Sequence, residues 1–478
     1  MDTKKDVPDI AALLRENGER GRLPMHMPGH KRNADCAPHL QSLSLKEDIT
    51  EIDGFDNLHG AEGILADSMA RAASLWGADR SYFLVNGASG GILAGIRALT
   101  RRGDTVLMTR AAHKSVYHAV ELCGLKPIFL LPPITDAGFF GSIPPSDVAE
   151  ALRAHPDVKL VILTSPTYEG VISDIAAVAE IAHNAGVPLL VDEAHGAHLD
   201  FSAHFLGGAV KAGADLVVQS VHKTLPSLTQ TAILHVCGSR VDADRLAHQL
   251  SVFETSSPSY LLLASIDGCV RAIAENGALL AGWAEALAYF DSLTHGLRHL
   301  KIPYHGAAAE GSDAAVFAYD RSKIYVSARG TSADGATLAA DLRARGIEPE
   351  MVTADGVLCM TGAGDTKDSL TALADALCAI DAEIHAESAS EILPGVPVPP
   401  LVLDSEDALA SAWESVPIAE AVGRTSAEYV WAYPPGIPLL IPGEEITEAC
   451  VRYIRAAGER IRLYGTRGAL PERIAVMT

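Results

Sequence analysis

The sequence contains little cysteine, and its cysteines are not paired in motifs. Seven cysteines occur in 478 residues, none of them in a C-x-x-C spacing. Zinc sites and redox motifs use such close spacings, and small secreted folds need a denser and more regular cysteine framework. We therefore expect reduced thiols, no disulfide framework and no zinc site.

The chain also lacks positive charge and long apolar runs. Lys and Arg total 38 against 60 Asp and Glu, a net charge of −22, which on average repels nucleic acid and anionic membranes. The opening residues, MDTKKDVPDI, have no apolar signal core, and no apolar stretch approaches the roughly 20 residues that span a bilayer. We expect a cytoplasmic protein that binds neither nucleic acid nor membrane.

Apolar residues are plentiful, at 48% of the chain, which is enough for two or three domain cores. From about Ser81 to Val236, short apolar runs alternate with amphipathic segments near 90–100, 115–123, 146–154 and 175–185. The runs are apolar on both sides, which predicts an α/β domain with a mostly parallel sheet covered on both faces by helices. The expected strands are SYFLV, DTVLM, PIFLL, KLVILT, VPLLVDE and DLVVQS.

The rest of the chain divides into smaller parts. After a helix-rich stretch (Ser259–His299), AAVFAYD, KIYVSA and VLCMTGAG alternate with helical runs at Gly335–Arg345 and Thr366–Ile380, which predicts a smaller α+β domain. The segment LPGVPVPP (Leu393–Pro400) indicates a linker. We expect an N-terminal arm (1–50), a large domain (51–295), a small domain (296–392) and a C-terminal module (393–478).

Two strands end in residues able to do chemistry. ADLVVQSVHKTLPSLTQ places Ser220, His222 and Lys223 just after a strand, where α/β sheets bind ligands; a lone lysine there is ordinarily a solvated surface group. In VPLLVDEAHGAH, Asp192 lies at the end of a strand. A carboxylate there could serve as a metal ligand, an acid or a helix cap. With pyridoxal phosphate (PLP) as ligand, Asp192 would hold the pyridine nitrogen protonated.

Two further turns could complete such a site. NGASGG (Asn86–Gly91) lies between a strand and a helix, where free N–H groups favour an anion such as a phosphate, although such turns also contain Gly and Ser for conformational reasons. His113 follows the next strand. Its imidazole could stack on a planar cofactor or serve as an ordinary residue at a helix start.

Some of these motifs are also compatible with a serine hydrolase or a metal site. GASGG matches the G-x-S-x-G elbow of serine hydrolases around Ser89, in the right strand–turn–helix order. That interpretation also needs an acid and a histidine in late loops, and it leaves SVHKT unexplained. PMHMPGHKRN and DEAHGAH are rich in histidine but give neither H-E-x-x-H nor a closed Cys/His set, so no metal site is expected.

Taken together, the segments resemble the Orn/Lys/Arg decarboxylase family of fold-type I PLP enzymes, particularly its shorter bacterial members. SVHKTLPSLTQ and YPPGIPLLIPGE are the specific ones. Departures include GHKRN, LHGAEG and Ala88, which stands where a hydroxyl residue is common. The segments in the family's order are PMHMPGHK, DITEIDGFDNLHGAEGIL, FLVNGASGG, HKSVYHA, SPTYEGVISDI, VDEAHGAH, SVHKTLPSLTQ and YPPGIPLLIPGE.

The resemblance implies an aspartate-aminotransferase-like large domain and assigns site residues. Lys223 would be the Schiff-base lysine, Asp192 would pair with the pyridinium, and His113 would stack on the ring. His195 would lie beside the cofactor, and Glu444 near the substrate entrance at a homodimer interface. Thr167 and Tyr168 are further candidates for substrate contact. The phosphate would be held by Ala88, Ser89, Gly90, Ser220 and His222.

The resemblance also implies decarboxylation of a basic amino acid to a polyamine or its precursor. Arginine is the first choice, before lysine and ornithine, and His222 or the freed Lys223 would return the proton. An aminotransferase or lyase of the same fold, and a non-catalytic PLP-binding protein, are the alternatives. Four carboxylates are candidates for the substrate's distal cation: Glu444, Glu445, Asp53 and Asp56.

Overall fold

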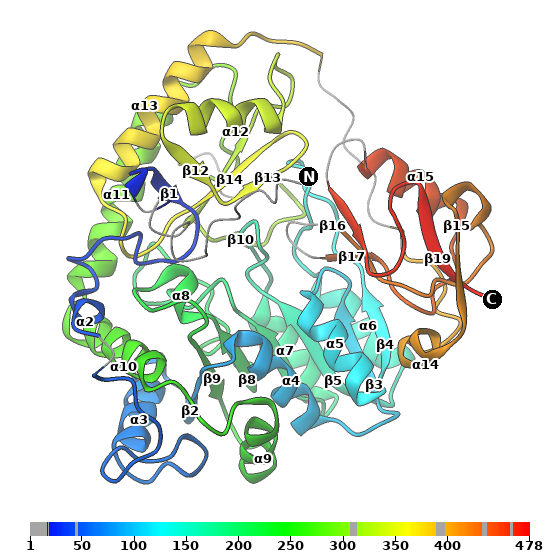
Figure 1. Cartoon of the computed structure of the whole chain (residues 1–478), viewed down its shortest axis with the longest axis horizontal. Coiled ribbons are helices and arrows are strands. Elements are labelled where there is room, and N and C mark those ends of the chain that lie inside the picture. Colours follow the sequence, from blue (N-terminus) through cyan, green and yellow to red (C-terminus); the bar gives the residue numbers. More distant parts are fainter. Residues whose placement is uncertain are drawn as a thin grey trace, which may run out of the picture.

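The computed structural model describes residues 17, 19–43, 46–305, 313–388, 397–432, 437–458 and 462–478. Residues 1–16 of the expected arm, residues 393–396 of the Pro-rich segment and residues 433–436 of YPPGIPLLIPGE lie outside the described residues. Figure 1 shows three packed parts: a large sheet with its helices, a smaller α+β part beside α11 and α13, and a C-terminal module beyond β3 and β4.

The large sheet has seven strands in the order β2-β9-β8-β7-β5-β3-β4 within the described chain. All six predicted strands are present, with ends shifted by no more than two residues. The seventh, β9, was not predicted and runs antiparallel to both β2 and β8, while the other pairings are parallel. The strands are β2 (Arg80–Leu84), β3 (Thr105–Thr109), β4 (Lys126–Leu130), β5 (Val158–Thr164), β7 (Leu189–Asp192), β8 (Leu216–Gln219) and β9 (Ala232–Val236).

Helices cover both faces of this sheet, as the two-sided apolar strands predict. Leu190 packs in one core with residues of α4, α5 and α9, whereas its neighbours Leu189 and Val191 pack in another with residues of α6 and α7. Each fully buried aliphatic side chain contributes about 1.5–3 kcal/mol. The helices are α4 (Gly87–Leu99), α5 (Lys114–Cys123), α6 (Pro145–Ala154), α7 (Ile175–Asn184) and α9 (Ala243–Phe253).

The smaller part contains a three-stranded antiparallel sheet backed by helices. The segment AAVFAYD supplies β10 (Ala318–Tyr319), which pairs with β6 (Val171–Ile172) of the large domain rather than with the small sheet. The N-terminal strand β1 (Leu23–Met25) pairs with β12 (Ile347–Pro349). The remaining elements are β11 (Lys323–Ser327), β13 (Met351–Val352), β14 (Gly356–Met360), α10 (Tyr260–Glu275), α11 (Ala278–Thr294), α12 (Gly335–Ala344) and α13 (Lys367–Glu383).

The C-terminal module has a hydrophobic core of its own, built around Val430, Leu440, Ile454 and Ile474. Strand β15 pairs with β19, and β16 lies between β17 and β18. Its elements are α14 (Ser405–Ala410), β15 (Trp413–Pro417), β16 (Val430–Ala432), β17 (Ile437–Leu440), α15 (Glu448–Gly458), β18 (Leu463–Gly465) and β19 (Arg473–Met477).

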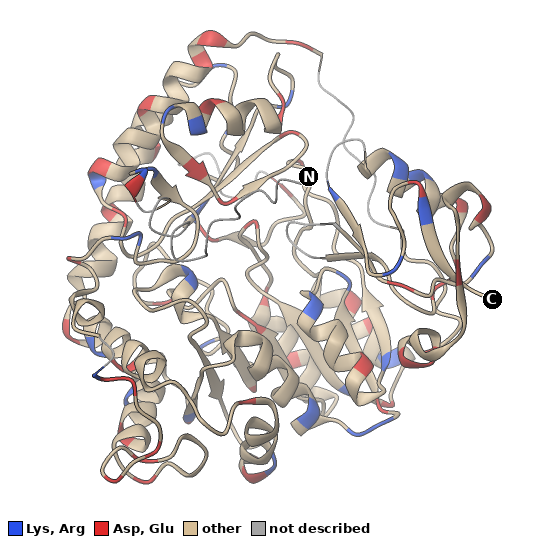
Figure 2. Ribbon diagram, in the orientation of Figure 1, with Lys and Arg blue, Asp and Glu red and all other residues tan. Residues whose placement is uncertain are grey.

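Acidic side chains are spread over the outer helices of the molecule (Figure 2), in keeping with the net charge of −22. None of the helices in the described ranges has the length and apolar character needed to cross a membrane. Those same ranges contain no cluster of three or more His, Cys, Asp or Glu side chains that could hold a metal ion.

Candidate functional site

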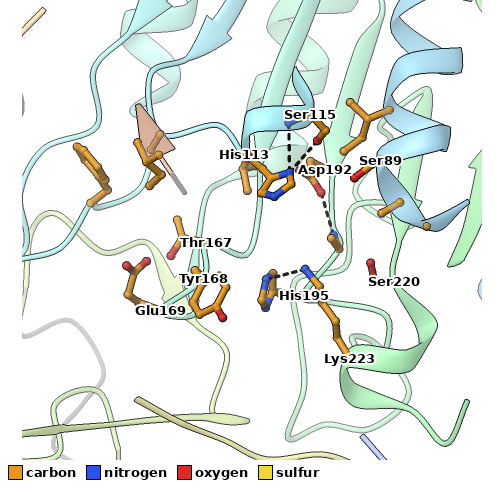
Figure 3. Close-up of a pocket in the computed structure, with 18 of the residues that line it drawn as sticks. Ser89, His113, Ser115, Thr167, Tyr168, Glu169, Asp192, His195, Ser220 and Lys223 are labelled. Atoms are coloured by element: carbon orange, nitrogen blue, oxygen red, sulfur yellow. Dashed lines mark hydrogen bonds between the residues drawn. The ribbon is translucent and has the colours of Figure 1, made fainter. Parts of the chain in front are cut away.

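A cavity of about 230 Å³ opens where the carboxyl ends of β5, β7 and β8 meet the first turns of α4 and α5. This is where parallel α/β sheets bind ligands. Figure 3 shows its polar side chains converging from several elements. The lining residues are Gly87, Ala88, Ser89, Ile92, Ala111, His113, Ser115, Phe140, Thr164, Thr167, Tyr168, Glu169, Asp192, Ala194, His195, Ser220, His222, Lys223 and Ile437.

Lys223 lies on α8 (Val221–Thr224), a single helical turn directly after β8. Its Nζ is 2.9 Å from Nε2 of His195. Burial lowers the pKa of Lys223 to about 8, against the opposing effect of the Asp192 and Glu350 charges. At neutral pH a useful fraction of Lys223 is therefore a free amine, the form that attacks a carbonyl.

The PMHMPGHK segment fixes the turn that carries Lys223. The N–H of Gly29 donates to the carbonyl of His222 at 2.7 Å, and the N–H of Gly364 donates to the carbonyl of Gly29 at 2.9 Å. A Cβ on Gly29 would lie 2.3 Å from the carbonyl carbon of Thr224, so only glycine permits this approach. The PMHMPGHK motif therefore holds the turn that carries Lys223 in place.

Asp192 ends β7 at the floor of the cavity, and it is 2% exposed. Its Oδ1 accepts a hydrogen bond of 3.1 Å from the N–H of Ala194. Burial raises the pKa of Asp192, and the positive charge of Lys223 acts in the opposite direction. A cationic ring nitrogen beside this carboxylate would compensate its burial.

Two histidines of the cavity are neutral. His113 is the N-cap of α5, and its Nδ1 accepts from the N–H of Ser115 at 3.3 Å. Burial and the charge of Lys223 lower its pKa to about 3. Burial and Lys223 also hold the pKa of His195 well below its usual range, and its ring centroid is 4.6 Å from that of Tyr168.

The start of α4 offers an anion site. Gly87, Ala88 and Ser89 line the cavity in the first helical turn, where N–H groups lack helical partners. Gly90 was predicted to share this task, but it lies outside the cavity lining. A Cβ on Gly90 would point to Oε1 of Glu254, 2.8 Å away. The N–H of Gly90 already bonds to the carbonyl of Asn86 at 3.3 Å.

Ser220 and His222 flank the same end of the cavity. The Nδ1 of His222 donates to the carbonyl of Thr231 at 2.8 Å. Burial lowers the pKa of His222 to about 4, so the imidazole is neutral near pH 7 and its Nε2 carries no proton.

The turn after β5 provides the opposite wall. Thr167 and Tyr168, the further candidates for substrate contact, both line the cavity. Oγ1 of Thr167 accepts from the N–H of Val171 at 3.1 Å, and the hydroxyl of Tyr168 donates to Glu350 at 2.5 Å. Glu169 also lines the cavity. The sequence alone assigns it no role, because it occurs only as part of the segment SPTYEGVISDI.

Glu444, predicted near the substrate entrance at a dimer interface, lies away from this cavity within the single chain. Glu444 is absent from the cavity lining among the described residues, and its side chain is fully buried. The guanidinium of Arg110 donates to both of its carboxylate oxygens. Both oxygens of this carboxylate are therefore engaged by Arg110 within the chain. Glu445, Asp53 and Asp56 also lie outside this lining.

The residues present fit PLP. The N–H groups at the start of α4 suit its phosphate, and the His113 imidazole suits a planar ring. The buried carboxylate of Asp192 suits the ring nitrogen, and the amine of Lys223 suits the aldehyde. Oγ1 of Thr164 and Nδ1 of His195 are buried without a hydrogen-bond partner among the described residues, which leaves polar atoms for a ligand. No hydrogen bond joins Ser89 to a histidine in the described part of the chain, which argues against the hydrolase interpretation.

Comparison with known proteins shows which family and fold the chain shares. The family model "Orn/Lys/Arg decarboxylase, major domain" matches residues 8–288, and the C-terminal domain of the same family matches residues 404–464. An arginine decarboxylase of Bacillus subtilis is 36% identical over 92% of this chain and 91% of its own.

A second arginine decarboxylase, from Halalkalibacterium halodurans, is 36% identical over 95% of this chain and 94% of its own. Among solved structures, the Francisella novicida lysine decarboxylase LdcF superimposes with a TM-score of 0.77. It is 18% identical, and the match covers 94% of this chain and 78% of that one. The fold is therefore shared well beyond the range of close sequence similarity.

Proposed function

The chain belongs to the Orn/Lys/Arg decarboxylase family, as a PLP-dependent amino-acid decarboxylase, and we propose that its substrate is arginine and its product agmatine. The names of the relatives at 36% identity support arginine over lysine and ornithine. The observation that carries the reaction is the buried Lys223 amine opposite Asp192 in one cavity. A basic substrate also suits the net charge of −22.

PLP, when bound, supplies a protonated aromatic ring that accepts the electron pair of the bond between Cα and the carboxylate carbon. Asp192 would hold a proton on the ring nitrogen, because a buried carboxylate favours a cation beside it. His113 would pack against the ring, while Ser89, Ser220 and the first N–H groups of α4 would bind the phosphate.

Lys223 would hold the cofactor through its amine and would be freed when the substrate amine took its place. Loss of carbon dioxide would leave the electron pair on the substrate, so Cα would need one proton. The neutral state of His222 makes this residue a poor acid, since its pKa is about 4. We therefore assign the proton to the freed Lys223, whose pKa of about 8 suits transfer in either direction near neutral pH.

The test is a product assay of the purified protein with arginine, lysine and ornithine. We expect carbon dioxide and agmatine from arginine, at a higher kcat/KM than with the other two. Lys223→Ala should lose both the visible absorption band of the attached cofactor and the activity. Faster turnover of lysine or ornithine would overturn the substrate assignment.

Other products would identify the alternative functions. A keto acid that retains the carboxylate would indicate an aminotransferase, and a visible band without turnover would indicate a non-catalytic PLP-binding protein. Absence of carbon dioxide with all three substrates contradicts the proposed reaction.

We also propose that the enzyme is a cytoplasmic homodimer. The free state of all seven cysteines supports a reducing compartment. Ile52, Phe55 and Ile64 are 51%, 43% and 56% exposed, and such apolar side chains on one segment favour burial by a second subunit. Light scattering should give twice the chain mass of 50.3 kDa, and a single-chain mass would contradict the dimer.

A further inference from the structure

The described lining of the cavity carries two carboxylates, Asp192 and Glu169, and only the first has a task so far. Asp192 lies at the carboxyl end of strand β7, where the ring nitrogen of the cofactor is expected. Glu169 comes from the turn after β5, and in Figure 3 it lies on the far side of Tyr168 from Lys223. A substrate whose amino group had taken the place of Lys223 on the cofactor would therefore face a second acidic side chain across the cavity.

The backbone around Glu169 is fixed by the segment at the end of β10. The hydroxyl of Tyr319 donates to the carbonyl of Glu169 at 2.6 Å, and the N–H of Asp320 donates to the carbonyl of Gly170 at 2.8 Å. Gly170 has φ +111°, a conformation suited to glycine, and a Cβ there would lie only 3.0 Å from the Lys323 side chain and 3.1 Å from the Tyr319 ring. The carboxylate is therefore carried by a rigid turn.

Glu169 has no cationic partner within the chain as described. It is 7% exposed, and no ion pair joins it to another described residue, whereas Glu444 has Arg110 and Asp320 has Lys323. Burial raises the pKa of Glu169, and hydrogen bonds from its own N–H and from Thr167 act in the opposite direction. A buried carboxylate without a cation favours binding of one.

We propose that Glu169 binds the distal cationic group of the substrate and so selects basic amino acids. This inference rests on the proposed function. A guanidinium can donate two parallel hydrogen bonds to one carboxylate, which combines charge with directional specificity. Removing the charge should weaken ground-state and transition-state binding alike, because the distal group does not change during the reaction.

The first experiment compares Glu169→Gln with the wild-type enzyme. We expect KM for arginine to rise about 10- to 100-fold, with kcat changed by less than about 3-fold. Calorimetry with agmatine, which keeps the guanidinium, should show an affinity loss of the same size. Inhibition by citrulline, which has a similar shape but no distal charge, should change by less than about 2-fold. Glu150→Gln, on the exposed face of α6, is the matched control.

A second variant covers the case in which Glu169→Gln fails to fold or to show the cofactor band. Glu169→Asp keeps the charge but withdraws it by one methylene, so preference should shift from arginine towards the longer homoarginine. The assignment would be overturned if Glu169→Gln kept its cofactor absorption band and showed unchanged KM and agmatine affinity. It would also be overturned if Glu169→Asp showed no shift in preference from arginine towards homoarginine.

Failure of the proposed function can be distinguished from failure of the Glu169 inference. The first would appear in the product assay of the wild-type enzyme, whereas the second would appear only when the variants are compared with it. If the wild-type enzyme acts on lysine instead, the same comparison with lysine and cadaverine still tests Glu169. Equal binding by wild type and Glu169→Gln would contradict the inference for either substrate.

Discussion

Arg110 and Glu444 are 334 residues apart, yet the guanidinium donates to both carboxylate oxygens, at 2.8 and 3.1 Å, and neither side chain is exposed. Arg110 follows β3 of the large sheet, and Glu444 follows β17. Glu444 also accepts from the N–H of Ile441 at 2.8 Å. The pair fastens the C-terminal module to the domain that carries the cavity.

Breaking this pair from one side should be costly. Arg110→Met leaves a buried carboxylate unpaired, so we expect the free energy of unfolding to fall by about 3–5 kcal/mol. Arg110→Met combined with Glu444→Leu should cost less than the sum of the single changes, because both charges are gone. Urea unfolding measures all three variants, and additive losses would show that the two residues do not interact.

Gly29→Ala should disturb Lys223 without touching the cavity. The added methyl group meets the Thr224 backbone at 2.3 Å, so the turn must shift, and we expect much weaker cofactor attachment. Absorbance titration with PLP provides the measurement. Gly282→Ala is the control: it lies in α11 with nothing within 4 Å and should stabilise the helix by about 0.5–1 kcal/mol. Full cofactor occupancy in Gly29→Ala would contradict the role of the motif.

The rate of cofactor attachment should depend on pH through Lys223. Only the neutral amine attacks, so the rate on cofactor-free protein should rise with pH to a midpoint of about 8 and then level. Asp192 raises the pKa of Lys223, so Asp192→Asn should move the midpoint to lower pH. Stopped-flow absorbance checks both, and a midpoint near the ordinary lysine value would contradict the burial argument.

Acid should destabilise the protein through its buried neutral histidines. Burial lowers the pKa of His235 to about 3, whereas an unfolded histidine has its ordinary value of 6.5. Between these values the unfolded chain binds more protons, so stability is lost as pH falls through this window, by up to about 1.4 kcal/mol per pH unit for this residue. His235→Gln should show a shallower loss from pH 6.5 to 4 in urea titrations. An unchanged slope would show that His235 is not the cause.

Local patterns predicted the large sheet well because each strand carries its own signal. Strand β9 was missed: its direction depends on pairing with both β2 and β8, and its buried His235 is satisfied by Ser81 and Gln219 from those strands. A polar residue in a core strand can be assigned only when its partners are known. The pairing of β10 with β6 was beyond sequence reasoning for the same reason.

The site residues divide in a similar way. Lys223, Asp192, His113, Ser89 and His195 follow strand ends, and the sheet brings strand ends together, so their convergence could be predicted. Gly90 faces Glu254 rather than the cavity, and Glu444 is buried against Arg110. Both outcomes depend on side chains from distant segments of the chain. Glu169 lies in a short turn whose direction is set by Tyr319 and Asp320, about 150 residues away, which no local pattern reveals.

The contact between Gly29 and the turn of Lys223 also constrains when the enzyme can become active. That turn is held by Gly29 on one side and by Ala363, whose N–H donates to the carbonyl of Thr224 at 2.8 Å, on the other. Contacts of such long sequence separation form late in folding. During synthesis a ribosome must therefore complete more than three-quarters of the chain before the lysine is held in place, and cofactor loading belongs to the finished protein.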